Sequence, residues 1–168
     1  MATTSLHLFK QDFKFSAAHF LIFDEARAER LHGHNYQVKV RCNISADMDY
    51  AQQGFAVDFA QLKLLIRQRL KLWDEMVLLP EKHPDMKMQI AGSNLEVKFR
   101  DRFYSFPANE VVRLSVTNTS VENLSRLLGE SLRQDFERIG IMAKISSIRV
   151  YVEESAGQGA ATQIAINR

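Results

Sequence analysis

The feature that most constrains the fold is an unbroken alternation of apolar and polar residues over positions 34–44. The even-numbered positions from Tyr36 to Ile44 are apolar, and the odd-numbered positions between them are polar or charged. Successive side chains of a β-strand point to opposite faces of the sheet. The pattern therefore predicts a long strand with one face in the core and the other face toward solvent.

A shorter alternating run lies within residues 9–19, where Phe13, Phe15 and His19 share one parity. This run predicts a second half-buried strand, because the residues between these positions are mostly polar or small. We expect the two strands to pair in a hairpin, with residues 21–31 as a long connecting loop.

Two helices are predicted further along the chain. Asp58 is a suitable N-cap for the first helix, and an apolar face follows it at helical spacing. That face comprises Phe59, Leu62, Ile66, Leu70 and Trp73. The second helix begins near Thr119, carries an apolar face over residues 121–139 and ends at Gly140, which is a fitting stop.

The remaining alternating runs predict further strands. Residues 88–113 contain two short apolar runs that predict an extra hairpin, and residues 148–154 and 161–166 predict two final strands. This order of elements predicts an α+β fold with an antiparallel sheet and both helices on one face. With 168 residues, we expect a single domain over positions 1–168.

Composition excludes several classes of protein. The formal net charge is only +2 and there is no Lys/Arg block, so no nucleic acid partner is indicated. A lone cysteine, Cys42, rules out an intramolecular disulfide, and its apolar parity predicts an inert core thiol. No apolar run approaches the ~18 residues of a membrane span. We expect a cytoplasmic protein without a membrane partner.

The strongest local signal for chemistry is His32-Gly33-His34. Residues two apart on a strand project to the same face, so both imidazoles can reach one ion. His19 ends the preceding strand on the matching parity, and pairing would bring all three histidines together. Three neutral nitrogens suit Zn²⁺ and leave a fourth position open, as in catalytic zinc sites. From the pattern alone, three ordinary hydrogen-bonded histidines remain an equal alternative.

Several sequence blocks resemble, in order, those of the 6-pyruvoyl-tetrahydropterin synthase family, which includes the 6-carboxytetrahydropterin synthases of queuosine biosynthesis. The blocks are Phe15-Ser-Ala-Ala-His19, Leu31-His-Gly-His-Asn-Tyr36, Val57-Asp-Phe-Ala-Gln-Leu-Lys63, Thr119-Ser-Val-Glu-Asn123 and Val152-Glu-Glu-Ser155. The resemblance covers nearly the whole chain. Residues 80–115 are the exception, because this region is longer than in short members and is expected to be an inserted hairpin.

The resemblance implies the tunnelling fold (T-fold), in which three subunits close a barrel and two trimers stack into a homohexamer. It implies active sites at subunit boundaries and 7,8-dihydroneopterin triphosphate as the usual substrate. By position, the zinc ligands are His19, His32 and His34. In this family, zinc binds the oxygens of the substrate side chain.

The resemblance also implies substrate-binding residues. Glu154 matches the glutamate that grips the pterin, and it shares the apolar face of Val150 and Val152. A carboxylate there could accept two hydrogen bonds from a pterin, although a solvated residue at a strand end is the alternative. Glu122 and Thr119 match positions near the substrate, but the Thr119-Ser-Val-Glu122 sequence is also a capping box that needs no ligand.

The chain departs from the common family pattern at the catalytic cysteine, whose position holds Ala28. Glu29 lies three residues before His32, which resembles a variant branch that has a glutamate instead of the cysteine. That branch converts dihydroneopterin triphosphate to 6-hydroxymethyl-7,8-dihydropterin, a folate precursor. We expect Glu29 to act as the general base, with an ordinary charged loop residue as the alternative and Glu25 as a neighbour of uncertain register.

A second departure concerns the Asp-His pair that follows the first helix in the family. Here the pair is Asp74 and Glu75. Histidine titrates near neutral pH, whereas glutamate does so only when burial raises its pKa. Asp74 and Glu75 are therefore catalytic candidates in a proton-transfer system that is either rearranged or lost.

These observations favour a zinc-dependent lyase that cleaves a dihydropterin triphosphate. The alternatives are a 6-pyruvoyl- or 6-carboxytetrahydropterin synthase, of the biopterin or queuosine pathway, and a non-catalytic pterin- or purine-binding protein that kept the zinc. A structural zinc domain is the least favoured, because Glu154 stands at the pterin-anchoring position.

Overall fold

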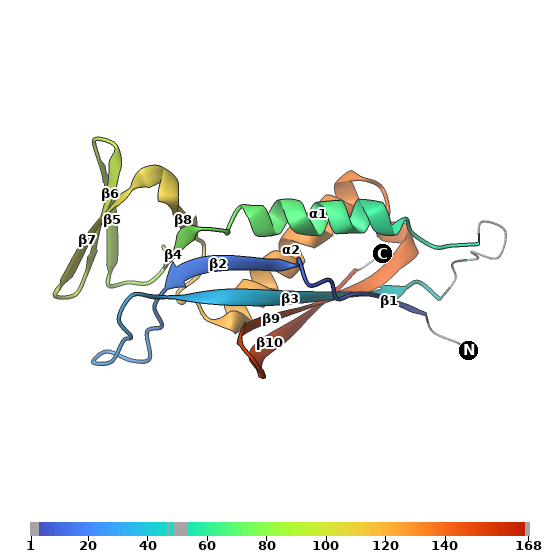
Figure 1. Cartoon of the computed structure of the whole chain (residues 1–168), viewed down its shortest axis with the longest axis horizontal. Helices are drawn as coiled ribbons and strands as arrows, with labels where there is room; N and C mark the ends of the chain where they lie inside the picture. Colours follow the sequence, from blue (N-terminus) through green and yellow to red (C-terminus); the bar gives the residue numbers. More distant parts are fainter. Residues whose placement is uncertain (1–3, 47, 49–53, 167–168) are drawn as a thin grey trace.

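A computed structural model describes residues 4–46, 48 and 54–166. In this part of the chain, one large sheet carries two helices on one face, and a small separate sheet lies at the end far from both termini (Figure 1). The elements in chain order are β1 (Ser5–Leu8), β2 (Lys14–His19), β3 (His32–Ile44), α1 (Phe59–Lys71), β4 (Met76–Pro80), β5 (Met86–Ala91), β6 (Asn94–Phe99), β7 (Arg102–Pro107), the 3-10 turn η1 (Ala108–Glu110), β8 (Val111–Leu114), α2 (Val121–Arg138), the 3-10 turn η2 (Met142–Lys144), β9 (Ile145–Ser155) and β10 (Gln158–Ala165).

The large sheet has the strand order β10-β9-β3-β2-β4-β8, and β1 also pairs with β3. The predicted hairpin of β2 and β3 is confirmed, in a register that places His19 opposite His32 and Ala17 opposite His34. All three histidines therefore share one face of the sheet.

The expectation of a purely antiparallel sheet is wrong, because β4 runs parallel to β2 and β8 runs parallel to β4. Helix α1 returns the chain along the length of the sheet, so β4 begins beside Ala17 and continues in the direction of β2. The chain then passes through β5, β6 and β7 before β8 begins. The large sheet is thus mixed, because long connections of this kind allow neighbouring strands to run parallel.

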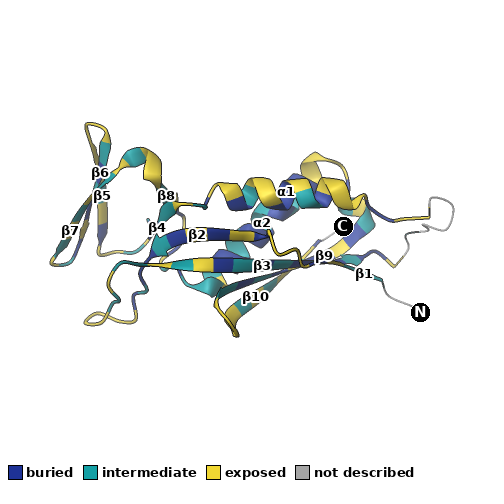
Figure 2. Ribbon diagram, in the orientation of Figure 1, coloured by how far each residue is buried: buried dark blue, intermediate teal, exposed yellow. Residues whose placement is uncertain are grey.

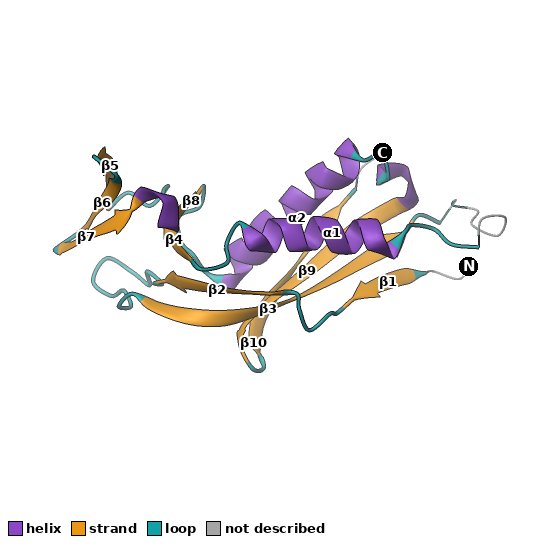
Figure 3. Cartoon of the chain, turned by 45° about the horizontal axis from the view of Figure 1, so that its top comes forward, coloured by secondary structure: helices purple, strands orange, loops and turns teal. Residues whose placement is uncertain are grey.

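Both helices cover the same face of the large sheet, as predicted (Figure 3). The core between the helices and the sheet contains the apolar side chains of β3 from Tyr36 to Ile44, buried side chains of β2 and β9, and the apolar faces of the helices. Figure 2 shows these elements coloured as buried along the middle of the sheet. Asp58 caps α1 by accepting a hydrogen bond of 2.7 Å from the Ala60 N–H, and Gly140 ends the α2 segment with φ +74°. Phe59 was expected on the buried face of α1 but is exposed; it is the first residue of the helix, and the buried residues of α1 begin one turn later at Leu62.

An extra hairpin of two strands was predicted within residues 88–113, but the structure has three strands in this region. Strands β5, β6 and β7 form a three-stranded antiparallel sheet, which we call the small sheet. The apolar parity of Met86, Met88 and Ile90 is the signal for the additional strand. No helix in the described ranges is long and apolar enough to cross a membrane.

A buried ion pair links the two helices, and its removal is expected to be costly. Asp135 of α2 is 3% exposed and accepts two hydrogen bonds of 2.7 Å from Arg69 of α1. Arg138 of α2 also donates to Asp135, at 2.8 Å. An Asp135→Ala substitution leaves both arginines, of which Arg69 is 28% exposed, without this buried carboxylate and should lower the free energy of unfolding by about 3 kcal/mol in urea titration. Glu137→Ala is the matched control, because its 3.7 Å pair with Arg133 is exposed and should contribute nothing measurable. Equal effects from both substitutions would contradict this assignment.

Candidate metal and pterin site

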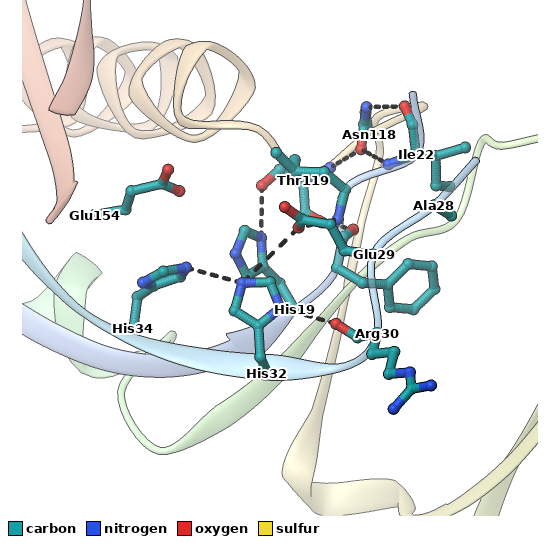
Figure 4. Close-up of polar contacts among 12 residues, drawn as sticks. His19, Ile22, Ala28, Glu29, Arg30, His32, His34, Asn118, Thr119 and Glu154 are labelled. Carbon is teal, nitrogen blue, oxygen red and sulfur yellow. Dashed lines mark hydrogen bonds and ion pairs between the residues drawn. The ribbon is translucent and has the colours of Figure 1, made fainter. Parts of the chain in front are cut away.

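The three histidines converge where β2 ends and β3 begins (Figure 4). One potential ligand atom from each of His19, His32 and His34 lies within 4.8 Å of the other two. The Nε2 atoms of His32 and His34 are 2.9 Å apart. The strand register produces this cluster, because cross-strand neighbours on one face are the closest side chains in a sheet.

Hydrogen bonds to main-chain carbonyls orient two of these rings. The Nδ1 atom of His19 lies 3.0 Å from the Thr119 carbonyl oxygen, and Nδ1 of His32 lies 2.8 Å from that of Arg30. A ring nitrogen facing a carbonyl oxygen carries the proton, so Nε2 of each ring keeps its lone pair. Carbonyl partners of this kind are typical of metal-binding histidines.

Burial adapts His19 to metal binding. Its side chain is 1% exposed, and its Nε2 atom is buried with no hydrogen-bond partner among the described residues. Desolvation lowers the pKa of His19 to about 4, so the ring is neutral at physiological pH. A buried, neutral, unpartnered nitrogen beside two more imidazoles fits a zinc ion, because zinc takes three neutral histidines in open catalytic sites.

The segment before α2 holds this arrangement together. The predicted capping box is wrong, because Ser120 is the N-cap residue and makes no side-chain cap bond. The Thr119 hydroxyl instead donates to the Phe20 carbonyl at 3.1 Å, while its own carbonyl faces His19. Thr119 therefore orients the His19 ring through its main-chain carbonyl.

Asn118 is a site residue that the sequence analysis missed. Its side-chain amide donates to the Ile22 carbonyl at 2.8 Å and its oxygen accepts from the Ile22 N–H at 3.2 Å. The same oxygen accepts from the Thr119 N–H at 3.1 Å. An Asn just before a helix start is a common local turn signal, but its partner 96 residues away could not be predicted.

Glu29 lies beside the histidines, at the end of the loop between β2 and β3. Its Oε2 atom accepts a hydrogen bond of 3.0 Å from the Leu21 N–H and is 3.8 Å from Nε2 of His32. Glu25 points elsewhere, because it lines an open pocket of about 610 Å³ with Asp85 and Arg100. Of the two loop glutamates, only Glu29 is therefore placed for chemistry at the histidine cluster.

Glu154 is the next-to-last residue of β9 and lies on the same face of the sheet as the histidines, and Figure 4 shows its carboxylate on the side of His34. Gln158 donates a hydrogen bond of 2.9 Å to this carboxylate. Tyr36 lies nearby with a buried hydroxyl that has no partner among the described residues, and burial, then the charge of Glu154, raises its pKa. The carboxylate and the histidine cluster thus flank one region of the helix-covered face.

The other candidate residues form no hydrogen bond or ion pair with the three histidines among the described residues. The Asp74 carboxylate accepts from the Ser16 N–H at 3.0 Å, and Lys71 lies 3.4 Å from it. Glu75 is exposed and lines a pocket of about 320 Å³ that it shares with Asn35 and with His34 of the histidine cluster. Glu122 is exposed in the first turn of α2. The roles assigned to these residues remain predictions.

Cys42 is a core residue, as its parity predicted. The side chain is fully buried, and burial raises the pKa of its thiol to about 12. The reactive thiolate is therefore essentially absent at pH 8 in the folded protein. We expect an aromatic disulfide reagent to label no thiol at pH 8 until denaturant is added, when one equivalent should react quickly. Rapid labelling of the native protein would show that Cys42 is accessible.

Fold and site together define the class of protein: an α+β scaffold with a mixed sheet and a three-histidine cluster suited to zinc. The chain belongs to the 6-pyruvoyl tetrahydropterin synthase family, whose sequence pattern matches residues 8–164. Among curated relatives, a putative 6-carboxy-5,6,7,8-tetrahydropterin synthase of Methanocaldococcus jannaschii is 26% identical over 147 residues, covering 88% of this chain and 87% of that protein. The 6-carboxy-5,6,7,8-tetrahydropterin synthase of Haemophilus influenzae is 23% identical, covering 84% and 89%.

Solved structures support the same assignment. The 6-pyruvoyl tetrahydropterin synthase of Plasmodium vivax superposes with a TM-score of 0.88 at 26% identity, covering 98% of this chain and 99% of that one. A variant of the Plasmodium vivax enzyme, in which a glutamate described as a catalytic residue is replaced by alanine, gives the same TM-score at 25% identity and the same coverage. The α+β fold with a mixed sheet is therefore that of this family of T-fold proteins.

Proposed function

We propose that this protein is a zinc-dependent lyase that acts on 7,8-dihydroneopterin triphosphate. His19, His32 and His34 would hold the zinc, Glu29 would act as the general base and Glu154 would anchor the pterin. The observation that carries the proposal is the Glu29 carboxylate, 3.8 Å from His32 Nε2. The usual cysteine position holds Ala28, and Cys42 is buried in the core.

The proposed chemistry divides between the metal and the carboxylate. Bound zinc would supply a Lewis acid that polarises the side-chain oxygens of the substrate. Glu29 accepts one hydrogen bond, from the Leu21 N–H, and keeps lone pairs for a substrate proton. The catalytic glutamate described for the Plasmodium vivax relative supports this role for Glu29.

For the product, we propose 6-hydroxymethyl-7,8-dihydropterin. Glu29 would take the proton of the side-chain hydroxyl farther from the ring as the bond between the two hydroxyl-bearing carbons breaks, and return it to the carbon left on the pterin. The other fragment would leave as an aldehyde that carries the triphosphate, so the cleavage needs no co-reactant. The glutamate in place of a cysteine favours this product. A second candidate is the 6-carboxy- or 6-pyruvoyl-tetrahydropterin product, which the names of the curated relatives favour.

Product identification tests the proposal and separates these candidates. Zinc-loaded protein is incubated with 7,8-dihydroneopterin triphosphate and the pterin products are identified by mass. Release of 6-hydroxymethyl-7,8-dihydropterin supports side-chain cleavage, and a carboxy or pyruvoyl product establishes the second candidate. Recovery of unchanged substrate from a stable complex would show a binding protein without turnover and would overturn the proposed lyase activity.

The proposed anchor gives a prediction about affinity. A Glu154→Gln substitution replaces one acceptor by a donor that faces the donors of the pterin ring, so pterin affinity should fall about 10- to 100-fold by calorimetry. Zinc content should not change. Glu153→Gln is the matched control, since Glu153 points to the other face, where it pairs with Lys39 at 3.7 Å. Equal losses for the two variants would refute the anchor.

The homohexamer implied by the family is also part of the proposal. Strands β10 and β8 end the strand order of the large sheet, so each presents an edge that a neighbouring subunit could pair with. The exposed Glu75 would then be available to a site at a subunit boundary. Sedimentation of the zinc-loaded protein tests the assembly.

A further inference from the structure

The small sheet contacts the loop that carries Glu29. Arg102, the first residue of β7, donates hydrogen bonds to the main-chain carbonyls of Ala28, at 3.0 Å, and of Glu29. Arg100 donates to the Asp24 carbonyl at 2.8 Å, further back in the same loop. Arg102 of β7 and Arg100, in the turn between β6 and β7, thus hold the main chain of the loop at two separate points.

A second hydrophobic cluster lies behind these hydrogen bonds. It joins Phe20 and Ile22 of the loop to buried side chains of the small sheet and of β4. Those side chains are Leu79, Met86, Leu95, Val97 and Phe99. The guanidinium of Arg102 lies 5.8 Å from the centroid of the Phe99 ring. The small sheet and the loop between β2 and β3 share this apolar core, so the small sheet supports the loop.

The contacts at Glu29 fix this residue from several directions. Its N–H donates to the Leu21 carbonyl at 2.8 Å, and its carboxylate accepts from the Leu21 N–H at 3.0 Å. Arg102 holds the remaining main-chain group, the carbonyl, together with the carbonyl before it. A planar guanidinium that binds two acceptors constrains their orientation as well as their distance.

We propose that Arg102 is a positioning residue that holds Glu29 in reach of the substrate. The proposal rests on the proposed function, in which Glu29 is the general base. A general base must lie within hydrogen-bond reach of the proton it removes, and a shift of about 1 Å can cost about 100-fold in rate. Arg102 uses its Nη1 and Nη2 donors on the loop, so it acts on the reaction through the main chain of Glu29.

Steady-state kinetics of the zinc-loaded protein test this role. For Arg102→Gln we expect kcat for 7,8-dihydroneopterin triphosphate to fall about 10- to 100-fold, with KM within about twofold. Arg102→Lys should recover part of the lost kcat, because an ammonium can still donate to one carbonyl. Arg100→Gln is the matched control, since it removes a similar hydrogen bond to the loop at Asp24 and should leave kcat nearly unchanged.

Further variants separate this proposal from the proposed function. Adding Arg102→Gln to Glu29→Gln should cause no further loss of kcat if Arg102 acts through Glu29.

The single variants show which of the two proposals fails. Full turnover of Glu29→Gln alone would overturn Glu29 as the base. An inactive Glu29→Gln beside a fully active Arg102→Gln would overturn the positioning role alone. A rise in KM with unchanged kcat would also overturn it, because Arg102 would then contact the substrate. If Arg102→Gln fails to fold, the kcat of Arg102→Lys decides.

Discussion

A Glu29→Gln substitution is expected to lower kcat for 7,8-dihydroneopterin triphosphate by about 10²- to 10⁴-fold, the usual contribution of a general base. The amide keeps an oxygen that can accept the Leu21 N–H at the distance of 3.0 Å seen for the carboxylate. The loop should therefore keep its conformation, while the group that accepts a proton is gone. Rapid-quench measurements with mass detection of the product would give the rate of a single turnover.

The control for this experiment is Glu25→Gln, which removes the same charge from the same loop. Glu25 is exposed and lines a pocket away from the histidines, so its replacement should leave kcat unchanged. Zinc content and pterin affinity should stay within about twofold of the unsubstituted protein in both variants. The loss of a binding contact of about 1.4 kcal/mol would instead change the affinity tenfold. Comparable activity of both variants would mean that another group removes the proton.

Local periodicity made the histidine cluster predictable. A two-residue period is a property of the strand itself, so His32 and His34 had to share a face. His19 lies on the matching parity of the preceding strand, so it joins the other two histidines once the two strands pair as a hairpin. The structure confirms this pairing and places His19 opposite His32. Cys42 and the N-cap Asp58 were predictable for the same reason, since burial and capping follow from near neighbours in sequence.

Contacts between distant segments were not predictable from such patterns. The partner of the Thr119 hydroxyl is the carbonyl of Phe20, 99 residues earlier, and this bond replaces the expected capping box. Arg102 reaches Ala28 across 74 residues. Any polar side chain on an edge strand has many possible partners, and only the packed structure selects one. The parallel pairing of β4 depends likewise on where a crossover returns the chain.

Replacing His19 tests whether the histidine cluster binds zinc. His19→Ala should weaken zinc binding more than about 100-fold, because even an outer-layer partner of a ligand contributes about 10- to 100-fold. Turnover should be lost with the metal. The reason lies in the buried Nε2 atom of His19, which has no other partner among the described residues. Metal analysis after gel filtration and competition with a chromogenic chelator would measure the change.

Thermal unfolding provides a readout that does not depend on activity. A ligand that binds only the folded state raises the unfolding temperature as its concentration exceeds its dissociation constant. Zinc should therefore stabilise the original protein and the His7→Ala control, since His7 is exposed on β1, but not His19→Ala. Stabilisation of all three proteins by zinc would place the metal elsewhere and leave the histidine cluster as a hydrogen-bonded feature of the core. Stabilisation that disappears only with His19 would tie the ion to the face of the sheet where Glu29 and Glu154 also lie.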